Sequence, residues 1–138
     1  MANFNVFDVG KMAMSAQMVR MNATASNLAN ASSIGSTPEE AYHAIRPVFE
    51  TEYAKGHAGL NSLATVRATD VKALDREPEA LFRPDHPQAD ENGFVYASTV
   101  NTEEEMVDML EASRQYQNVL EAVSTMRTLM SRTMAMGK

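Results

Sequence analysis

Cysteine and tryptophan are absent from this chain of 138 residues, and basic residues are few. Without cysteine, disulfides, thiolate nucleophiles and cysteine-based zinc sites are excluded. The 12 lysines and arginines are outnumbered by 18 acidic residues, which gives a formal net charge of -6. Because phosphate binding needs clustered basic side chains, nucleic acid is excluded as the main partner. No apolar run approaches the ~20 residues of a membrane-spanning helix, so we expect no membrane insertion.

A cleaved secretory signal is also missing from the first ten residues. This segment has no basic region and no continuous apolar run. We therefore expect a protein that stays inside the cell or leaves it by a route that uses no such signal. The length predicts one small domain, or one small domain plus an extension, with a modest core.

Each end of the chain carries an apolar stripe at helical spacing. The first comprises Phe7, Met14, Met18, Met21, Ala25 and Leu28. The second comprises Met109, Ala112, Tyr116, Val119, Val123, Met126 and Met130. The first is interrupted only by Lys11, and the second steps by alternating threes and fours. That step averages 3.5 residues, the seam period of a left-handed coiled coil. The stripes predict two long helices that pair with each other, with copies of themselves, or with both. This favours a protein whose function is to assemble with other subunits.

Capping residues predict where these helices begin and end. The first is expected from Asn3 to about Asn30, with Asn3 or Asn5 as the N-cap. The second is expected from Thr102 to Met136, with a capping box formed by Thr102 and Glu105. Eleven methionines, most of them in these two helices, fit either an ordinary helical core or an interface with several non-identical neighbours.

The middle of the chain has a different period. Weak alternation in Val48–Tyr53, and around Leu63, Val66, Val71 and Leu74, predicts short half-buried strands. Gly56 and Gly59 mark a turn between the two runs, and Asn92-Gly93 predicts a tight turn before a strand at Phe94–Tyr96. The predicted fold is α+β, with the long terminal helices paired as a coiled-coil-like bundle and a small β-rich module between them. The expected division is 1–31 plus 101–138 for the helical domain and 32–100 for the loop and β-rich module.

No catalytic, cofactor-binding or metal-binding constellation is apparent in the sequence. His43, His57 and His86 are far apart, and the segment 85–93 does not follow calcium-loop spacing. Phosphate loops, nucleophile elbows and zinc-protease motifs are missing. We therefore expect neither an enzyme nor a cofactor.

Five stretches of the chain resemble a known family. The run Thr24–Ala31 is similar to the N-terminal signature of the rod and hook proteins of the bacterial flagellum, the axial proteins. The other stretches are Phe4–Asp8 with Ala13–Gln17, Arg46–Glu50, Pro84–Val95 and Glu105–Gln117. Together they resemble the proximal rod proteins of the basal body over nearly the whole length.

This resemblance implies a structural role. Family members leave through the flagellar export apparatus without a cleaved signal peptide and assemble into the rod that crosses the periplasmic space. The implied partners are other rod proteins, copies of the chain itself and the export-gate adaptor of the basal body. The predicted assembly interface comprises Phe7, Met14, Met18, Met21, Ala25, Asn27, Leu28, Asn30, Met109, Ala112, Tyr116, Val119, Val123, Met126 and Met130.

Several alternatives stay open at this level. Asn27 and Asn30 are suited either to capping the first helix or to hydrogen-bonding a neighbour's backbone. A soluble coiled-coil adaptor or export chaperone that never polymerises is the second functional hypothesis. An enzyme is the third, and it requires the three histidines to converge. We also expect the isolated subunit to be partly disordered at both ends, because its stripes lack partners.

Overall fold

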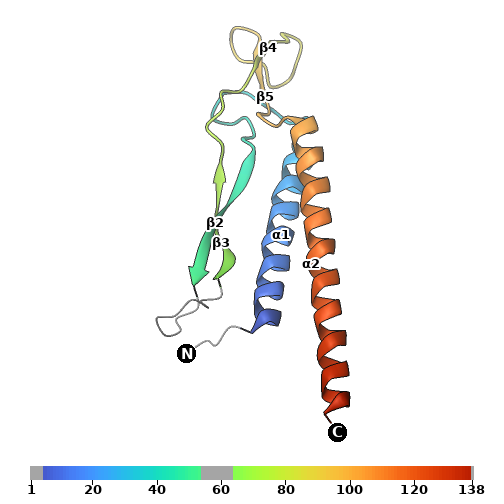
Figure 1. Ribbon diagram of the computed structural model, residues 1–138. Helices are drawn as coiled ribbons and strands as arrows, with labels where there is room; N and C mark the ends of the chain where they lie inside the picture. Colours follow the sequence, from blue (N-terminus) through green and yellow to red (C-terminus); the bar gives the residue numbers. More distant parts are fainter. Residues whose placement is uncertain (1–4, 54–63, 138) are drawn as a thin grey trace.

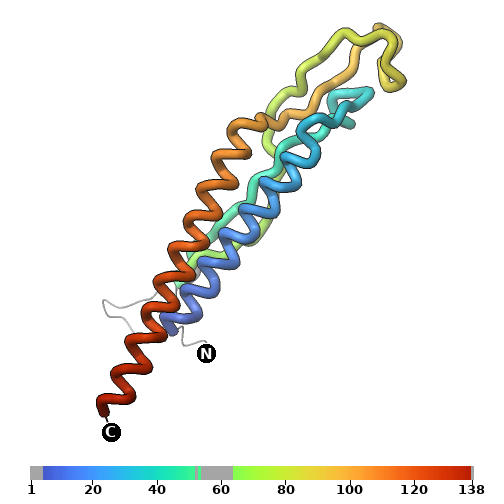
Figure 2. Tube along the Cα trace, turned by 90° about the vertical axis from the view of Figure 1, so that its right-hand side faces the viewer, coloured from blue at the N-terminus to red at the C-terminus, as the bar shows by residue number. Residues whose placement is uncertain are grey.

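The computed structural model describes residues 5–53 and 64–137 of the chain. In these two ranges the elements follow the order α1, β1, β2, β3, β4, β5 and α2. The molecule is elongated, with the two helices side by side along its length (Figures 1 and 2). The predicted cap at Asn3, the turn glycines Gly56 and Gly59, and Leu63 lie outside the described residues.

Helix α1 spans Val6–Ala29, close to the predicted range. Asn5 is its N-cap and forms a capping box with Asp8, whose carboxylate accepts a hydrogen bond from the Asn5 N–H at 3.0 Å. Asn30 is the C-cap, and its side-chain amide donates to the Ser26 carbonyl at 2.8 Å. These two ends satisfy backbone groups that a helix leaves without partners.

Helix α2 spans Thr102–Met136, as predicted, but the predicted capping box is wrong. The N-cap is Asn101, whose side-chain oxygen accepts from the N–H groups of Glu103 and Glu104 at 3.0 and 3.2 Å. Thr102 is already the first helical residue. Glu105 is only 1% exposed and bonds to groups on other elements, so it does not cap the helix.

The helices run antiparallel (Figure 1), and they pack closely at Gly10. A Cβ atom at Gly10 would overlap the Cγ2 atom of Val123. Around this point Val6, Gly10 and Ala13 of α1 lie against Val119, Val123 and Met126 of α2. Glycine disfavours a helix interior, but at this position the missing side chain lets the two backbones come together.

Three faces of α1 have three different environments. At about 100° per residue, one face bears the residues that meet α2, which are Val6, Gly10, Ala13, Arg20 and Asn27. A second face packs on strands, through Met12, Ser15, Ala16 and Val19. The third bears the predicted stripe, and its Met18 is 48% exposed. The predicted stripe therefore does not form the α1 face that packs on α2. The residues of that face lie one position earlier in the sequence, and they include the polar side chains of Arg20 and Asn27.

Strands β2 (Ile45–Tyr53) and β3 (Ala64–Ala73) form an antiparallel hairpin on the second face of α1. The hairpin and α2 therefore lie on different sides of α1 (Figure 1). The Thr65 hydroxyl, which is buried, lies 3.2 Å from the sulfur of Met12. A bulge between Val48 and Phe49 interrupts the register. The predicted strands in this region are confirmed. β2 begins three residues before the predicted alternation, and β3 falls within it.

A second small sheet lies at the end of the molecule where α2 begins (Figure 1). Its order is β1-β5-β4, with β1 at Ile34–Gly35, β4 at Ala80–Phe82 and β5 at Phe94–Ala97. Gly93, at φ +83°, makes the predicted tight turn before β5. In the part of the chain that the structure describes, no helix is both long enough and apolar enough to cross a membrane.

Candidate functional site

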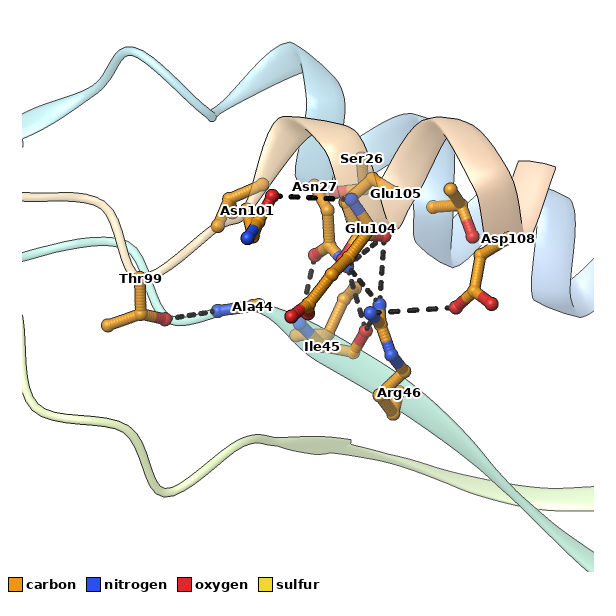
Figure 3. A network of polar contacts seen from close by, with 12 residues as sticks. Ser26, Asn27, Ala44, Ile45, Arg46, Thr99, Asn101, Glu104, Glu105 and Asp108 are labelled. Carbon is orange, nitrogen blue, oxygen red and sulfur yellow. Dashed lines mark hydrogen bonds and ion pairs between the residues drawn. The ribbon is translucent and has the colours of Figure 1, made fainter.

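The side chain of Asn27 is completely buried and joins three elements (Figure 3). Its amide nitrogen donates to the Ile45 carbonyl of β2 at 2.9 Å and to a Glu105 carboxylate oxygen of α2 at 3.0 Å. Its oxygen accepts from the Ile45 N–H at 2.9 Å and from the Tyr42 hydroxyl at 3.1 Å. Asn27 thus pairs with the start of β2 as a neighbouring strand would, although it belongs to a helix.

Glu105 is the acidic partner at the centre of this network. It is 1% exposed, and its two carboxylate oxygens lie 2.6 and 2.8 Å from the Nη1 atom of Arg46 on β2. Removing an ionised carboxylate from water costs several kcal/mol. The arginine and the Asn27 amide offset that cost, because both donate to this one carboxylate.

The network continues along α2 through Asp108. This carboxylate is 3.5 Å from Arg46 Nη2 and 3.0 Å from Arg20 Nη2 of α1. Arg20 also lies 3.5 Å from Glu111, one turn further along. Two arginines from α1 and β2 therefore alternate with three carboxylates of α2. We call Arg20, Asn27, Arg46, Glu105 and Asp108 the polar joint.

Backbone contacts fix the segments around the polar joint. The Ala44 N–H donates to the Thr99 hydroxyl at 2.9 Å, and the Thr99 N–H donates to the Tyr42 carbonyl at 2.9 Å. The Leu74 N–H donates to the Ala44 carbonyl at 2.7 Å. Ser26 reaches the Tyr42 hydroxyl at 3.2 Å. The chain that leads into β2 is thereby held to α1, to β3 and to the segment before α2.

The two signature asparagines act within the chain itself. Asn30 caps α1, and Asn27 hydrogen-bonds the backbone of the chain's own β2. The capping alternative therefore describes Asn30. Asn27 hydrogen-bonds a backbone, as the second alternative predicts, but this backbone belongs to the same chain and not to a neighbouring subunit. Any contribution of these residues to assembly stays a prediction.

The structure separates the other predicted interface residues into covered and uncovered groups. Ala112 is buried, and the half-buried group comprises Phe7, Met14, Met21, Leu28, Met109, Tyr116, Val119, Val123 and Met126. Ala25 is exposed, Met18 is 48% exposed and Met130 is 52% exposed. The α2 stripe is therefore largely used against α1, while parts of the α1 stripe face solvent. Contacts of either stripe with a neighbouring subunit stay a prediction.

Sequence reasoning missed the polar joint and a second exposed surface. Arg46 and Glu105 are 59 residues apart, and no periodicity connects a strand residue with a helical one at that separation. On the side of α2 away from its seam, Met106, Val107 and Leu110 are 55%, 63% and 60% exposed. These three apolar residues, which we call the outer α2 patch, lie at helical spacing and could have been found from the sequence.

The histidines make local contacts in the described part of the chain. His43 Nδ1 lies 2.8 Å from the Ala41 carbonyl oxygen, and His86 Nδ1 accepts from the Gln88 N–H at 3.1 Å. His57 lies outside the described residues. Within residues 5–53 and 64–137, no group of three or more His, Asp or Glu side chains is placed to hold a metal ion. The polar turn around His86 is thus explained by hydrogen bonds in the loop.

Two family models match the helical ends of the chain. The model described as "Flagella basal body rod protein" matches residues 7–35, and the model described as "Flagellar basal body rod FlgEFG protein C-terminal" matches residues 91–136. The chain is 35% identical over 138 residues to the flagellar basal-body rod protein FlgC of Salmonella typhimurium, and the match covers 100% of both chains. The chain belongs to the FlgC-type flagellar rod proteins.

Other FlgC proteins also match this rod protein over most of its length. The FlgC of Aquifex aeolicus is 35% identical over 134 residues, which cover 94% of this chain and 93% of its own. The FlgC of Buchnera aphidicola from Acyrthosiphon pisum is 29% identical over 143 residues, with full coverage of both chains. The expectation of a proximal-rod family member is confirmed. The chain is therefore a structural rod protein of the flagellar basal body.

In this FlgC-type chain, the polar joint links the two segments that the family models match. Asn27 and Arg20 lie in the first matched segment, and Glu105 and Asp108 lie in the second. Arg46 lies between them, on the hairpin. The joint therefore connects the two helices in the matched segments with the β2–β3 hairpin of the rod protein.

Proposed function

We propose that this chain is a passive subunit of the proximal rod, which assembles with copies of itself and with other rod proteins into the axial drive shaft. The observation that carries the proposal is the apolar surface left open on both helices. It includes Met18 of α1 and the outer α2 patch, all of them about half exposed or more. Exposed apolar residues at helical spacing, as in the outer α2 patch, favour contact with neighbouring subunits.

The polar joint suits a subunit that transmits torque. A shaft loses rotation if its subunits bend internally, so the helices and the hairpin must move together. Arg46 and Asn27 connect the hairpin to both helices, and Arg20 connects α1 to α2 a second time. We propose that these contacts make the subunit stiff. We assign no catalytic step to them.

We further propose that α1 and α2 pair in a coiled-coil-like manner. The α1 seam steps by three and four residues through Val6, Gly10, Ala13, Gln17, Arg20, Thr24 and Asn27. Small residues at its start and hydrogen-bonding residues at its end match the stripe and the carboxylates of α2. In this proposal residues 1–31 and 101–138 form the axial core, and residues 32–100 form the outer module.

Membership of the family supports a cellular location for this subunit. We propose that the chain crosses into the periplasmic space through the flagellar export apparatus, without a cleaved signal peptide, and joins the rod there. The export-gate adaptor of the basal body is the proposed neighbour at the start of the rod. Neither nucleic acid binding, nor membrane insertion, nor enzymatic activity is part of this proposal.

Leu110→Glu tests the proposal, because Leu110 is 60% exposed and the change leaves the internal seam intact. We expect the variant to fold normally, and yet to be missing from purified basal bodies of a non-motile strain. Gln117→Glu is the matched control, since it adds the same charge at an exposed position two turns further along the same face. Quantitative mass spectrometry of basal bodies measures incorporation.

Normal incorporation and motility of Leu110→Glu would contradict the proposed contact. The soluble adaptor or chaperone hypothesis predicts a different result, in which the wild-type chain itself is absent from basal bodies that are otherwise complete.

A further inference from the structure

The end of helix α2 extends beyond the helix that it packs against. α1 begins at Val6, which lines the same groove as Met126 of α2, whereas α2 continues to Met136. The α2 seam stripe continues into this extension at Met130 and Met134, which are 52% and 75% exposed, and Leu129 is 55% exposed. We call residues 127–136 the C-terminal tip. The tip continues an established helix interface without a described residue of α1 opposite it.

The charge of the chain is distributed unequally between its two ends. Residues 122–137 contain Arg127 and Arg132, both exposed, and no acidic residue. Residues 75–104, at the opposite end of the molecule (Figure 1), contain eight carboxylates and two arginines. Their net charge of -6 equals that of the whole chain. We call residues 75–104 the acidic end.

The acidic end also has an apolar feature that fits the C-terminal tip. Phe82 and Phe94 are 66% and 37% exposed and pack edge to face, with ring centroids 5.3 Å apart. Methionine sulfur contacts aromatic rings favourably. Beside the start of α2, Glu77, Glu79 and Glu103 line an open hollow of about 550 Å³. Arg76, which also lines it, is paired with Glu104 at 3.0 Å.

We propose that the C-terminal tip of one copy docks on the acidic end of a second copy, head to tail. Met130 and Met134 meet the Phe82–Phe94 pair, and Arg127 and Arg132 face the carboxylates of Glu77 and Glu79. The proposal rests on the proposed rod function and specifies one contact within it. A symmetric tip-to-tip contact is disfavoured, because it would bring four arginines together without a carboxylate in either tip.

A head-to-tail contact has a consequence for assembly. Each bound copy still presents a free tip at one end and a free acidic end at the other, so the contact propagates. Because exposed charges are screened beyond ~10 Å at 0.1 M salt, the contact weakens as the salt concentration rises.

Cysteine cross-linking tests this contact cleanly, because the chain has no cysteine of its own. The variant Phe82→Cys/Met134→Cys, in the full-length chain, is oxidised both as purified protein at high concentration and in isolated basal bodies. We expect a ladder of covalent multimers in at least one of the two samples. Val71→Cys/Met134→Cys is the matched control, since Val71 is 45% exposed on the hairpin, and it yields no ladder.

Charge reversal then tests the electrostatic part. Adding Arg127→Glu and Arg132→Glu to the cross-linking variant lowers the ladder yield at least tenfold at low salt. Adding Glu77→Lys and Glu79→Lys as well restores most of it. Reversal without effect on the yield overturns the assigned charge pairing.

The remaining outcomes also decide the proposal. No ladder in either sample overturns it, and so does a dimer formed by Met134→Cys alone, which indicates a tip-to-tip contact. Presence of the wild-type chain in basal bodies is scored separately. If the chain is present and no ladder forms, the docking inference fails and the rod function stands. If the chain is absent, the rod function fails, and the purified protein still decides the docking.

Discussion

At the scale of single residues, Glu105 is a charged side chain held inside the molecule. It is almost fully buried, yet it is bonded to the Arg46 guanidinium and to the Asn27 amide. A buried ion pair adds little net stability when compared with an apolar pair, but losing one partner leaves the other charge without compensation. The polar joint therefore adds little to the free energy of unfolding, but removing one of its members lowers that free energy strongly. Such an ion pair fixes the relative position of the elements that it joins.

Replacing Glu105 with leucine is expected to lower the free energy of unfolding by about 3 kcal/mol, because Arg46 and Asn27 lose their shared acceptor. Arg46→Met is expected to cost at least as much, about 3–4 kcal/mol, because it leaves the buried carboxylate of Glu105 without its cationic partner. The double variant should cost clearly less than the sum. Urea unfolding measures all three.

The matched control is the exposed pair Arg76 and Glu104, whose side chains are 45% and 48% exposed. Breaking it should cost about 0.5 kcal/mol or less. A strictly additive cycle for Arg46 and Glu105 would show that the two side chains are not coupled, against the geometry of the joint.

At the scale of elements, α1 determines how the rest of the molecule is arranged. Its three faces meet α2, the β2–β3 hairpin and solvent. Close packing on the first face depends on small residues, of which Gly10 is the most restrictive because Val123 occupies the space of a Cβ atom. The helix therefore gives up some intrinsic stability at Gly10 in exchange for a close approach to α2.

Gly10→Ala tests this view of the helix pair. In an isolated helix the change would stabilise by up to about 1 kcal/mol, but here we expect a loss of about 1–2 kcal/mol from overpacking against Val123. Thermal unfolding of the variant is the measurement, and Val123→Ala in the same chain should recover part of the loss. Lys11→Ala, at the neighbouring exposed position, controls for helix propensity. An increase in melting temperature for Gly10→Ala alone would refute the close-packing argument.

At the scale of the whole molecule, internal stability and assembly use different parts of α2. The residues that cover α1 end near Met126, and every residue from 127 to 137 is exposed. The C-terminal tip therefore adds little to the folded state of one chain.

Ending the chain after Leu129 is expected to change the free energy of unfolding by less than about 1 kcal/mol, as for other exposed helix ends. The same truncation should abolish incorporation into basal bodies, because the tip is the proposed contact with the next copy. Urea unfolding and mass spectrometry of basal bodies measure the two effects. Large destabilisation of the truncated chain would mean that the tip supports the fold.

Much of the secondary structure could be predicted from local signals. Periodicity and capping located α1 and α2 to within a few residues, and Asn92-Gly93 marked the turn before β5. The errors were also local. Asn101, and not Thr102, caps α2, and both are good capping residues one position apart. Strands β1 and β4 were missed, since two and three residues are too short to show a period.

The α1 face that meets α2 and the polar joint were decided only by the tertiary structure. A hydrophobic pattern selects the most apolar face of α1, the one with Met14 and Met18, whereas the face that meets α2 contains Gly10, Arg20 and Asn27. Gly10 and Asn27 are buried and Arg20 is half-buried, because α2 approaches closely and α2 and β2 supply polar partners. The sequence by itself determined the two helices, their ends and the family. Which surfaces became internal and which stayed open was decided by contacts between segments as far apart as Gly10 and Val123, and local periodicity carries no information on such pairs.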